Sequence, residues 1–211
     1  MEAAAAIHGV PPLGGHLVEA AGRTDGAIVR DLLALAGVDP GAVDARWTAV
    51  QTAAVEAYAE LCPPDLSATV APGIPELLDA LAARPDVFRL SLVTGNLEAV
   101  ARLKLDRAGL GRHFGPGQGG FGSDDEAREA LPPIARARAA DPPWPRERTA
   151  VVGDTPRDIA CARADGLRVA AVATGPFGAA ELAGADVVVD DARVLLGVLE
   201  GWARQTGPPS G

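Results

Sequence analysis

The stretch TAVVGDTPRD, residues 149–158, decides the fold class of this chain. Its apolar run at 150–152 is typical of a buried strand in a parallel sheet, and Gly153 lets the backbone turn. Thr155 and Pro156 suit the cap and the first turn of a following helix. The stretch therefore predicts a strand, a turn and a helix, which is the repeating unit of an α/β fold.

Two carboxylates follow this predicted strand. Asp154 stands at its carboxyl end and Asp158 comes four residues later, so both can reach one point in space. Ligands of open α/β sheets bind at this edge. Oxygen ligands of this kind suit Mg²⁺, which takes a few carboxylates, water and substrate phosphate. The alternative is that Asp154 only caps backbone N–H groups, and this stretch alone leaves both interpretations open.

The rest of the chain divides into a helical first part and an alternating second part. Helical spacing of apolar residues predicts helices over 27–36 and from Asp39 to Leu61, after an uncapped helix end at 1–7. From Pro72 onward, helices alternate with predicted strands at 88–93, 119–122, 149–153, 168–173 and 185–189. The pattern predicts a doubly wound parallel sheet. The predicted division is a helical region at 1–70, an α/β core at 71–205 and a disordered tail at 206–211.

A second predicted strand also ends in polar residues, Thr94-Gly95-Asn96, before a predicted helix over 97–108. A helix N-terminus offers N–H groups and positive partial charge to a phosphate, and the Thr94 hydroxyl would add a donor. Lys104, in that helix, is the only lysine among 19 basic residues, and it could reach back toward this seat. The alternatives are that Thr94 is a helix cap and that Lys104 lies on a solvated face.

Composition narrows the partners and the compartment. A net charge of −9 argues against a nucleic-acid surface. No apolar stretch is long enough to span a bilayer, and the first residues lack the pattern of a signal peptide. Only two cysteines are present, which fits a reducing compartment. We therefore expect a cytoplasmic protein without nucleic-acid or membrane partners, and oligomeric state stays open.

Taken together, Thr94, Lys104 and the G-D-x-x-x-D pattern at 153–158 resemble three of the four motifs of the haloacid-dehalogenase-like (HAD) hydrolases. Longer similarity to the phosphoglycolate-phosphatase-like branch of that superfamily covers residues 21–25, 92–110 and 151–166. The resemblance implies a HAD-like Rossmannoid fold with a small helical cap. It also implies an Mg²⁺-dependent phosphatase that acts on a small phosphorylated metabolite.

The resemblance assigns a role to each candidate residue. Thr94, with the backbone of 95–96, would hold the substrate phosphate, and Lys104 would neutralise negative charge on it. Asp154 would bind Mg²⁺, and Asp158 would support the metal or Lys104. Such a site suits phosphoryl transfer, in which catalysis is largely positioning and charge stabilisation.

The chain departs from the family at the first motif, a strand ending in D-x-D-G-T/S that carries the nucleophile. Residues 1–20 precede the region similar to the cap and contain no aspartate, and the pairs at 124–125 and 190–191 come too late. In the family this strand lies in the middle of the sheet, between the strands that end at Thr94 and Gly153. We therefore expect the central strand to be missing.

Two hypotheses follow: a phosphatase whose recorded start is too late, or a catalytically dead domain that binds a phosphorylated ligand or a protein. In-frame codons for a strand ending in D-x-D-G upstream of Met1 would favour the first. In either case we expect no hydrolysis by these 211 residues, weak Mg²⁺ binding and low stability. The flanking strands would either pair directly or leave a slot that recruits residues 1–10 or a second molecule.

Overall fold

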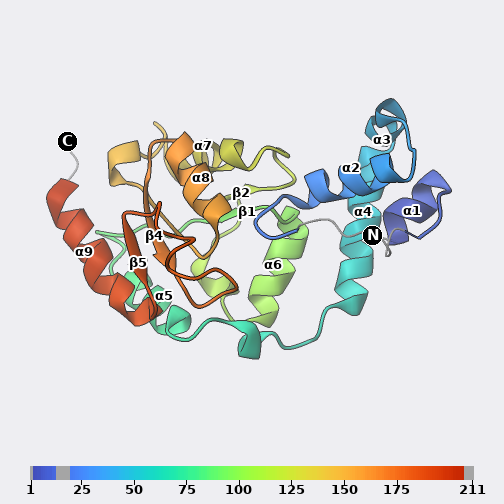
Figure 1. Cartoon of the computed structure of the whole chain (residues 1–211). Coiled ribbons are helices and arrows are strands. Elements are labelled where there is room, and N and C mark those ends of the chain that lie inside the picture. Colours follow the sequence, from blue (N-terminus) through green and yellow to red (C-terminus); the bar gives the residue numbers. More distant parts are fainter. Residues whose placement is uncertain (1, 13–19, 207–211) are drawn as a thin grey trace.

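The computed structural model describes residues 2–12 and 20–206 of the chain. Four helices lie at one end of the molecule and the strands lie at the other (Figure 1). Residues 207–211 of the predicted tail fall outside the described residues. No helix within 2–12 or 20–206 has both the length and the apolar character needed to cross a membrane.

The helical end is held together by its own apolar core. Its helices are α1 (Glu2–His8), α2 (Asp25–Leu35), α3 (Pro40–Ala45) and α4 (Trp47–Leu61). Buried residues of all four helices, among them Ala5, Leu33 and Val50, form one cluster. The single helix predicted from Asp39 to Leu61 is wrong, because the backbone leaves helical geometry at Arg46.

As far as the chain is described, the other end combines two short parallel sheets with five α-helices. Its strands are β1 (Val93–Thr94), β2 (Gly120–Phe121), β3 (Ala150–Gly153), β4 (Arg168–Val172) and β5 (Val187–Val189). Its helices are α5 (Ile74–Ala82), α6 (Glu98–Arg107), α7 (Leu131–Ala139), α8 (Pro156–Ala164) and α9 (Leu195–Thr206). Every strand pair is parallel, in the orders β1–β2 and β3–β4–β5. A mixed α/β fold with parallel strands is therefore confirmed.

Strand β4 shows why helices cover both faces of the larger sheet. Val169 and Ala171 are buried in a cluster with α8, whereas Ala170 and Val172 are buried in a cluster with α5 and α9. Alternate residues of a strand point to opposite faces, so β4 is covered on both sides. Around this strand, helices cover both faces of the sheet, as in the doubly wound parallel sheet predicted from the sequence.

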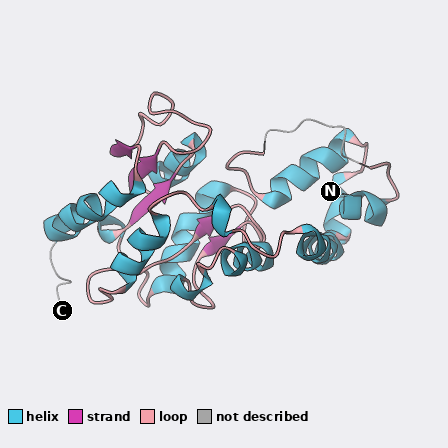
Figure 2. Ribbon diagram, turned by 90° about the horizontal axis from the view of Figure 1, so that it is seen from below, coloured by secondary structure: helices cyan, strands magenta, loops and turns pink. Residues whose placement is uncertain are grey.

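The expected single sheet is split in two (Figure 2). Of the strand predicted at 88–93, only Val93 is in a strand, because residues 88–91 have no strand partner among the described residues. Strand β3 is formed as predicted, but the prediction that it is buried is wrong. Within residues 2–12 and 20–206 it is an edge strand paired only with β4, and Val152 is 40% exposed.

A slot separates β1 from β3, with residues 89–93 on one wall and 148–152 on the other. It consists of two adjoining cavities, of about 180 Å³ on the side of α7 and about 430 Å³ on the side of α5 and α9. The two strands do not pair directly, contrary to one expectation from the sequence. Residues 2–8 do not fill the slot either, since they form α1 and pack with the helical end.

Candidate functional site

The tip of β1 holds the first group of predicted site residues. The Thr94 hydroxyl accepts a hydrogen bond from the Asn96 backbone N–H at 3.2 Å, which turns the chain into α6. Gly95 is buried, and a side-chain carbon there would lie 2.1 Å from the carbonyl oxygen of Arg23. Only glycine fits such a close approach of two backbones. The sequence Thr94-Gly95-Asn96 therefore forms a tight turn against the start of α2.

Asp25, which the sequence analysis did not propose as a site residue, binds this turn from α2. Its carboxylate accepts hydrogen bonds from the Asn96 side-chain amide at 3.0 Å and from the Leu97 backbone N–H at 2.9 Å. The negative carboxylate thus lies at the positive end of α6, where an anion is stabilised. The predicted phosphate seat at this helix start is already occupied in part by a carboxylate of the same chain.

Lys104 also reaches Asn96. Its ammonium group donates to the side-chain oxygen of Asn96 at 2.9 Å and lies 5.2 Å from the centroid of the Tyr58 ring. Burial, followed by a hydrogen bond with Cys62, raises the pKa of Tyr58 to about 12. The phenol is therefore neutral at pH 7 and attracts Lys104 through its ring face. Asn96 thus joins a carboxylate and an ammonium group at one strand tip.

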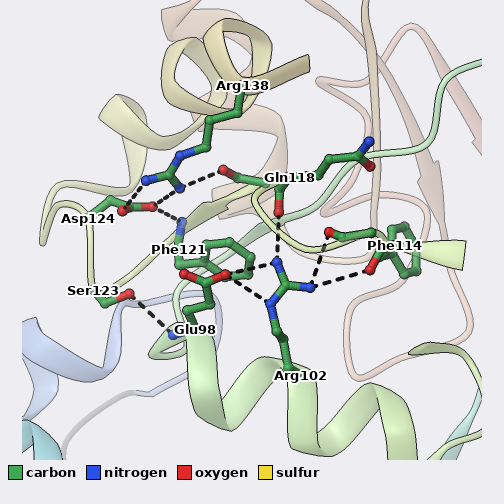
Figure 3. Close-up of polar contacts among 10 residues, drawn as sticks. Glu98, Arg102, Phe114, Gln118, Phe121, Ser123, Asp124 and Arg138 are labelled. Carbon is green, nitrogen blue, oxygen red and sulfur yellow. Dashed lines mark hydrogen bonds and ion pairs between the residues drawn. The ribbon is translucent and has the colours of Figure 1, made fainter. Parts of the chain in front are cut away.

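The loop after β2 completes the start of α6 (Figure 3). The Ser123 hydroxyl accepts from the Glu98 N–H at 3.2 Å, so a second N–H of this helix start has a partner within the chain. Nearby, Asp124 pairs with Arg138 of α7 at 2.7 Å and also accepts from the Phe121 N–H at 2.9 Å. These bonds fix the loop against both helices.

Arg102 fastens the same region from α6 (Figure 3). Its guanidinium group pairs with Glu98 at 2.8 Å and donates at 3.3 Å to three carbonyl oxygens, those of Phe114, Gly115 and Gln118. It lies 5.4 Å from the centroid of Phe121, which is fully buried. Strand β2 and its loops are therefore held rigidly beside the first tip.

Asp158 is fully engaged at the second tip, after β3. One of its oxygens accepts from the backbone N–H groups of Asp154 and Thr155 at 3.2 and 3.1 Å and from the Thr155 hydroxyl at 2.8 Å. The other oxygen pairs with Arg128 at 2.5 Å. Thr155 and Asp158 thereby form a capping box at the start of α8. This carboxylate acts in this structure as a structural anchor.

Asp154 reaches solvent beside Asp158. Partial burial of its carboxyl group, and then the negative charge of Asp158, raise its pKa above the usual value. A nearby cation would relieve that repulsion, so the Asp154 carboxylate fits a single metal ligand. No group of three or more His, Cys, Asp or Glu residues within 2–12 and 20–206 could hold a metal ion. These residues therefore fit Mg²⁺ only in part.

The structure places the predicted residues in two groups on either side of the slot. Thr94, Asn96 and Lys104 are linked at the first tip, and Asp154 and Asp158 at the second. Lys104 hydrogen-bonds to Asn96, whereas Asp158 pairs with Arg128. Of the two roles expected for Asp158, support of Lys104 is not formed in this structure, and support of a metal stays a prediction.

Comparison with known families adds one finding. Residues 127–195, about a third of the chain, match the model of a family described as HAD-hydrolase-like. The match supports the HAD superfamily. The matched segment contains the second tip, with Asp154 and Asp158, but not Thr94 or Lys104. No curated protein matches the chain.

Two residues that the sequence analysis missed, Asp25 and Arg128, are the direct partners of predicted ones. Asp25 lies 71 residues before Asn96, and Arg128 lies 30 residues before Asp158. No local pattern links residues that far apart. Two signals pointed to Asp25: its place just before a predicted helix, where an acidic residue already has a local explanation, and its membership of the stretch 21–25 that resembles the family.

Proposed function

We propose that this chain carries the phosphate-binding and metal-binding side chains of a HAD-like, Mg²⁺-dependent phosphate monoester phosphatase of the phosphoglycolate-phosphatase-like kind. Its substrate would be a small phosphorylated metabolite. The observation that carries the proposal is the pair of polar strand tips beside the slot, with Thr94 and Lys104 at one and Asp154 at the other. The nucleophilic aspartate would come on a strand that occupies the slot.

Each tip would contribute in its own way. The Thr94 hydroxyl accepts from Asn96 and keeps its own proton to donate to a phosphate oxygen. Lys104, held on Asn96, brings positive charge to the same turn. These groups position a phosphate and stabilise its charge, which is most of what phosphoryl transfer requires. Asp154 is the candidate for contact with Mg²⁺.

A second candidate is a catalytically inactive HAD-like domain that binds a phosphorylated ligand or a protein. The observation that favours it is the carboxylate of Asp25 on the N–H group of Leu97, where a substrate phosphate would be expected. The pairing of Asp158 with Arg128 also favours the inactive domain, because it engages one of the two expected metal-site carboxylates. In this case both tips would be structural remnants.

Phosphate release from p-nitrophenyl phosphate tests the first candidate. The 211-residue chain alone should release none with Mg²⁺ present, because it lacks a nucleophile to form an aspartyl phosphate. A form extended at its N-terminus by a strand ending in Asp-x-Asp-Gly should be active. In that form Lys104→Gln should abolish activity, whereas Thr52→Ala, an exposed change on α4, should leave it unchanged.

Two outcomes would contradict the proposal. Rapid Mg²⁺-dependent hydrolysis by the 211-residue chain would show that the nucleophile has been misassigned. An extended form that is folded and binds inorganic phosphate, yet releases none from the ester, would favour the inactive binding domain instead.

A further inference from the structure

The slot between β1 and β3 has the hydrogen-bonding edges of two sheets on opposite sides. Within the described residues, β1 pairs with β2 alone and β3 with β4 alone. The outer edge of each therefore presents backbone N–H and C=O groups without a ladder partner. An inserted strand could use both edges at once.

The two faces of the slot differ in polarity. On one side the lining combines Pro132 of α7 with the charged residues Arg136 and Asp158. On the other side it comes from α5 and α9, including Leu77 and Leu199. A segment between these layers would point alternate side chains into each. The set that faces α5 and α9 would have to be apolar, whereas the set that faces α7 would meet both apolar and charged groups.

One end of the slot is basic. Arg89, Arg148 and Arg168 line it where the walls begin, ahead of the two strand tips, together with one acidic residue, Glu147, so positive charge is in excess there. Arg168 starts β4, opposite Ala150, and stacks over Trp202. One nitrogen of its guanidinium group, Nη1, is buried and has no hydrogen-bond partner in the described structure. A buried unpaired donor is unfavourable, so this end is suited to an acidic or carbonyl acceptor.

We propose that the slot binds an extended peptide strand of about five to six residues, apolar at the alternate positions that face α5 and α9 and acidic at its amino end. The strand would complete a continuous sheet from β2 to β5, by addition to the free edges of β1 and β3. The inference rests on the proposed function, because the occupant is the partner that completes the same site. Binding itself requires no catalytic residue.

Val152 gives a direct way to block the slot. It lines both cavities and is 40% exposed without an occupant, so Val152→Glu should be tolerated by the free chain. With a strand inserted, the new carboxylate would be buried without a partner. Val194→Glu is the matched control, because Val194 is 54% exposed, on the 3₁₀ turn Ala192–Val194 away from the slot lining. Ala150→Glu is a second blocking variant at an exposed position.

The probe is a fluorescein-labelled synthetic peptide, Glu-Val-Ile-Val-Phe-Val-Asn-Gly, titrated into the full chain by anisotropy. It should bind with micromolar affinity, raise the melting temperature and slow amide exchange at 89–93 and 150–153. Val152→Glu and Ala150→Glu should weaken binding by at least about tenfold. Val194→Glu should not change it. A peptide with proline at alternate positions should not bind, because it lacks the ladder donors.

The basic end is tested by a double-mutant cycle. Arg168→Gln should weaken binding of the glutamate peptide by about fivefold or more and leave the glutamine analogue unaffected. Equal binding of the proline peptide, or full binding by Val152→Glu, would overturn the proposal. The proposal would also be overturned by a chain that is a dimer in solution and that a substitution in the slot converts to a monomer. A second copy of the chain would then be the occupant.

The outcomes separate this proposal from the proposed function. A peptide that ends in Asp-x-Asp-Gly and binds in the slot without restoring hydrolysis would refute the phosphatase and support the slot. An N-terminally extended chain that hydrolyses phosphate esters, while the 211-residue chain binds no strand, would refute the slot as a site for a separate peptide and support the phosphatase.

Discussion

Replacing Asp25 by asparagine should have opposite effects on stability and on phosphate binding. The carboxylate of Asp25 accepts two hydrogen bonds, at 3.0 Å from the Asn96 amide and at 2.9 Å from the Leu97 N–H. The asparagine side chain would keep the shape and one acceptor oxygen but would lose the charge. The change therefore removes an anion from the positive end of α6 while leaving the turn in place.

Both magnitudes can be estimated from these contacts. Hydrogen bonds to a charged group contribute about 1.5–3 kcal/mol and neutral ones about 0.5–1.5 kcal/mol. Asparagine offers one acceptor oxygen, so two bonds to a charged group give way to one neutral bond. With a helix-dipole contribution of about 0.3–1 kcal/mol, the variant should lose about 3–5 kcal/mol of stability. For a chain of this size that lowers the melting temperature by roughly 6–20 °C. Loss of a like charge about 4 Å from a bound anion should favour binding by at least about 1 kcal/mol, or about fivefold.

Calorimetric titration of inorganic phosphate at low ionic strength, together with thermal melting, measures both effects. Asp31→Asn is the matched control, because Asp31 lies on the same helix, is exposed and pairs only with Arg23 among the described residues. This control should leave both the phosphate affinity and the melting temperature nearly unchanged. Phosphate affinity that falls or stays constant in Asp25→Asn would refute the idea that Asp25 competes for the phosphate seat.

Three further predictions concern the rest of the molecule. Asp165→Asn should lower stability by about 3 kcal/mol at pH 7, because it breaks a buried pair with Arg136. Burial alone would raise the pKa of Asp165, but bonds from Arg136 lower it overall, so urea denaturation should show this stabilisation lost as pH falls below about 4. Asp154→Asn should raise the melting temperature at pH 7 and not at about pH 3, because partial burial raises the Asp154 pKa and its ionised form disfavours folding. Gly95→Ala should cost about 3 kcal/mol or more in a urea titration, because the added carbon would meet the Arg23 carbonyl at 2.1 Å.

The features that the sequence predicted correctly depend on residues close together along the chain. The start of α8 is one, because the cap Thr155 and the first-turn Pro156 are adjacent; that Asp158 completes a capping box there was not predicted. The parallel pairing of β3 with β4 is another, since the helix between them is short and well marked. Periodicity and capping are local properties, and local reasoning is enough for them.

What the sequence could not give depends on partners far away or not among the described residues. The run from Phe88 to Val93 has the composition of a strand, but a strand also needs a neighbour, and most of this run has none. For the same reason Val152, apolar and central in its motif, is left partly exposed. The contact of Asp25 with Asn96 was hidden because it joins the helical end to a strand tip.

The slot stays open because helices, and not strands, set its width. Helix α7 packs on β1 and β2, while α8 packs on β3 and β4, and the two helices are joined by the buried pair of Arg136 with Asp165. Just before α7, Arg128 makes a second such link to Asp158 at the tip of β3. Closing β1 onto β3 would have to displace these links, and breaking a buried ion pair costs about 3–5 kcal/mol. A few new ladder bonds at about 1 kcal/mol each would scarcely offset that loss. An inserted strand, by contrast, gains bonds on both edges without moving either helix, so filling the slot is the favourable way to complete the sheet.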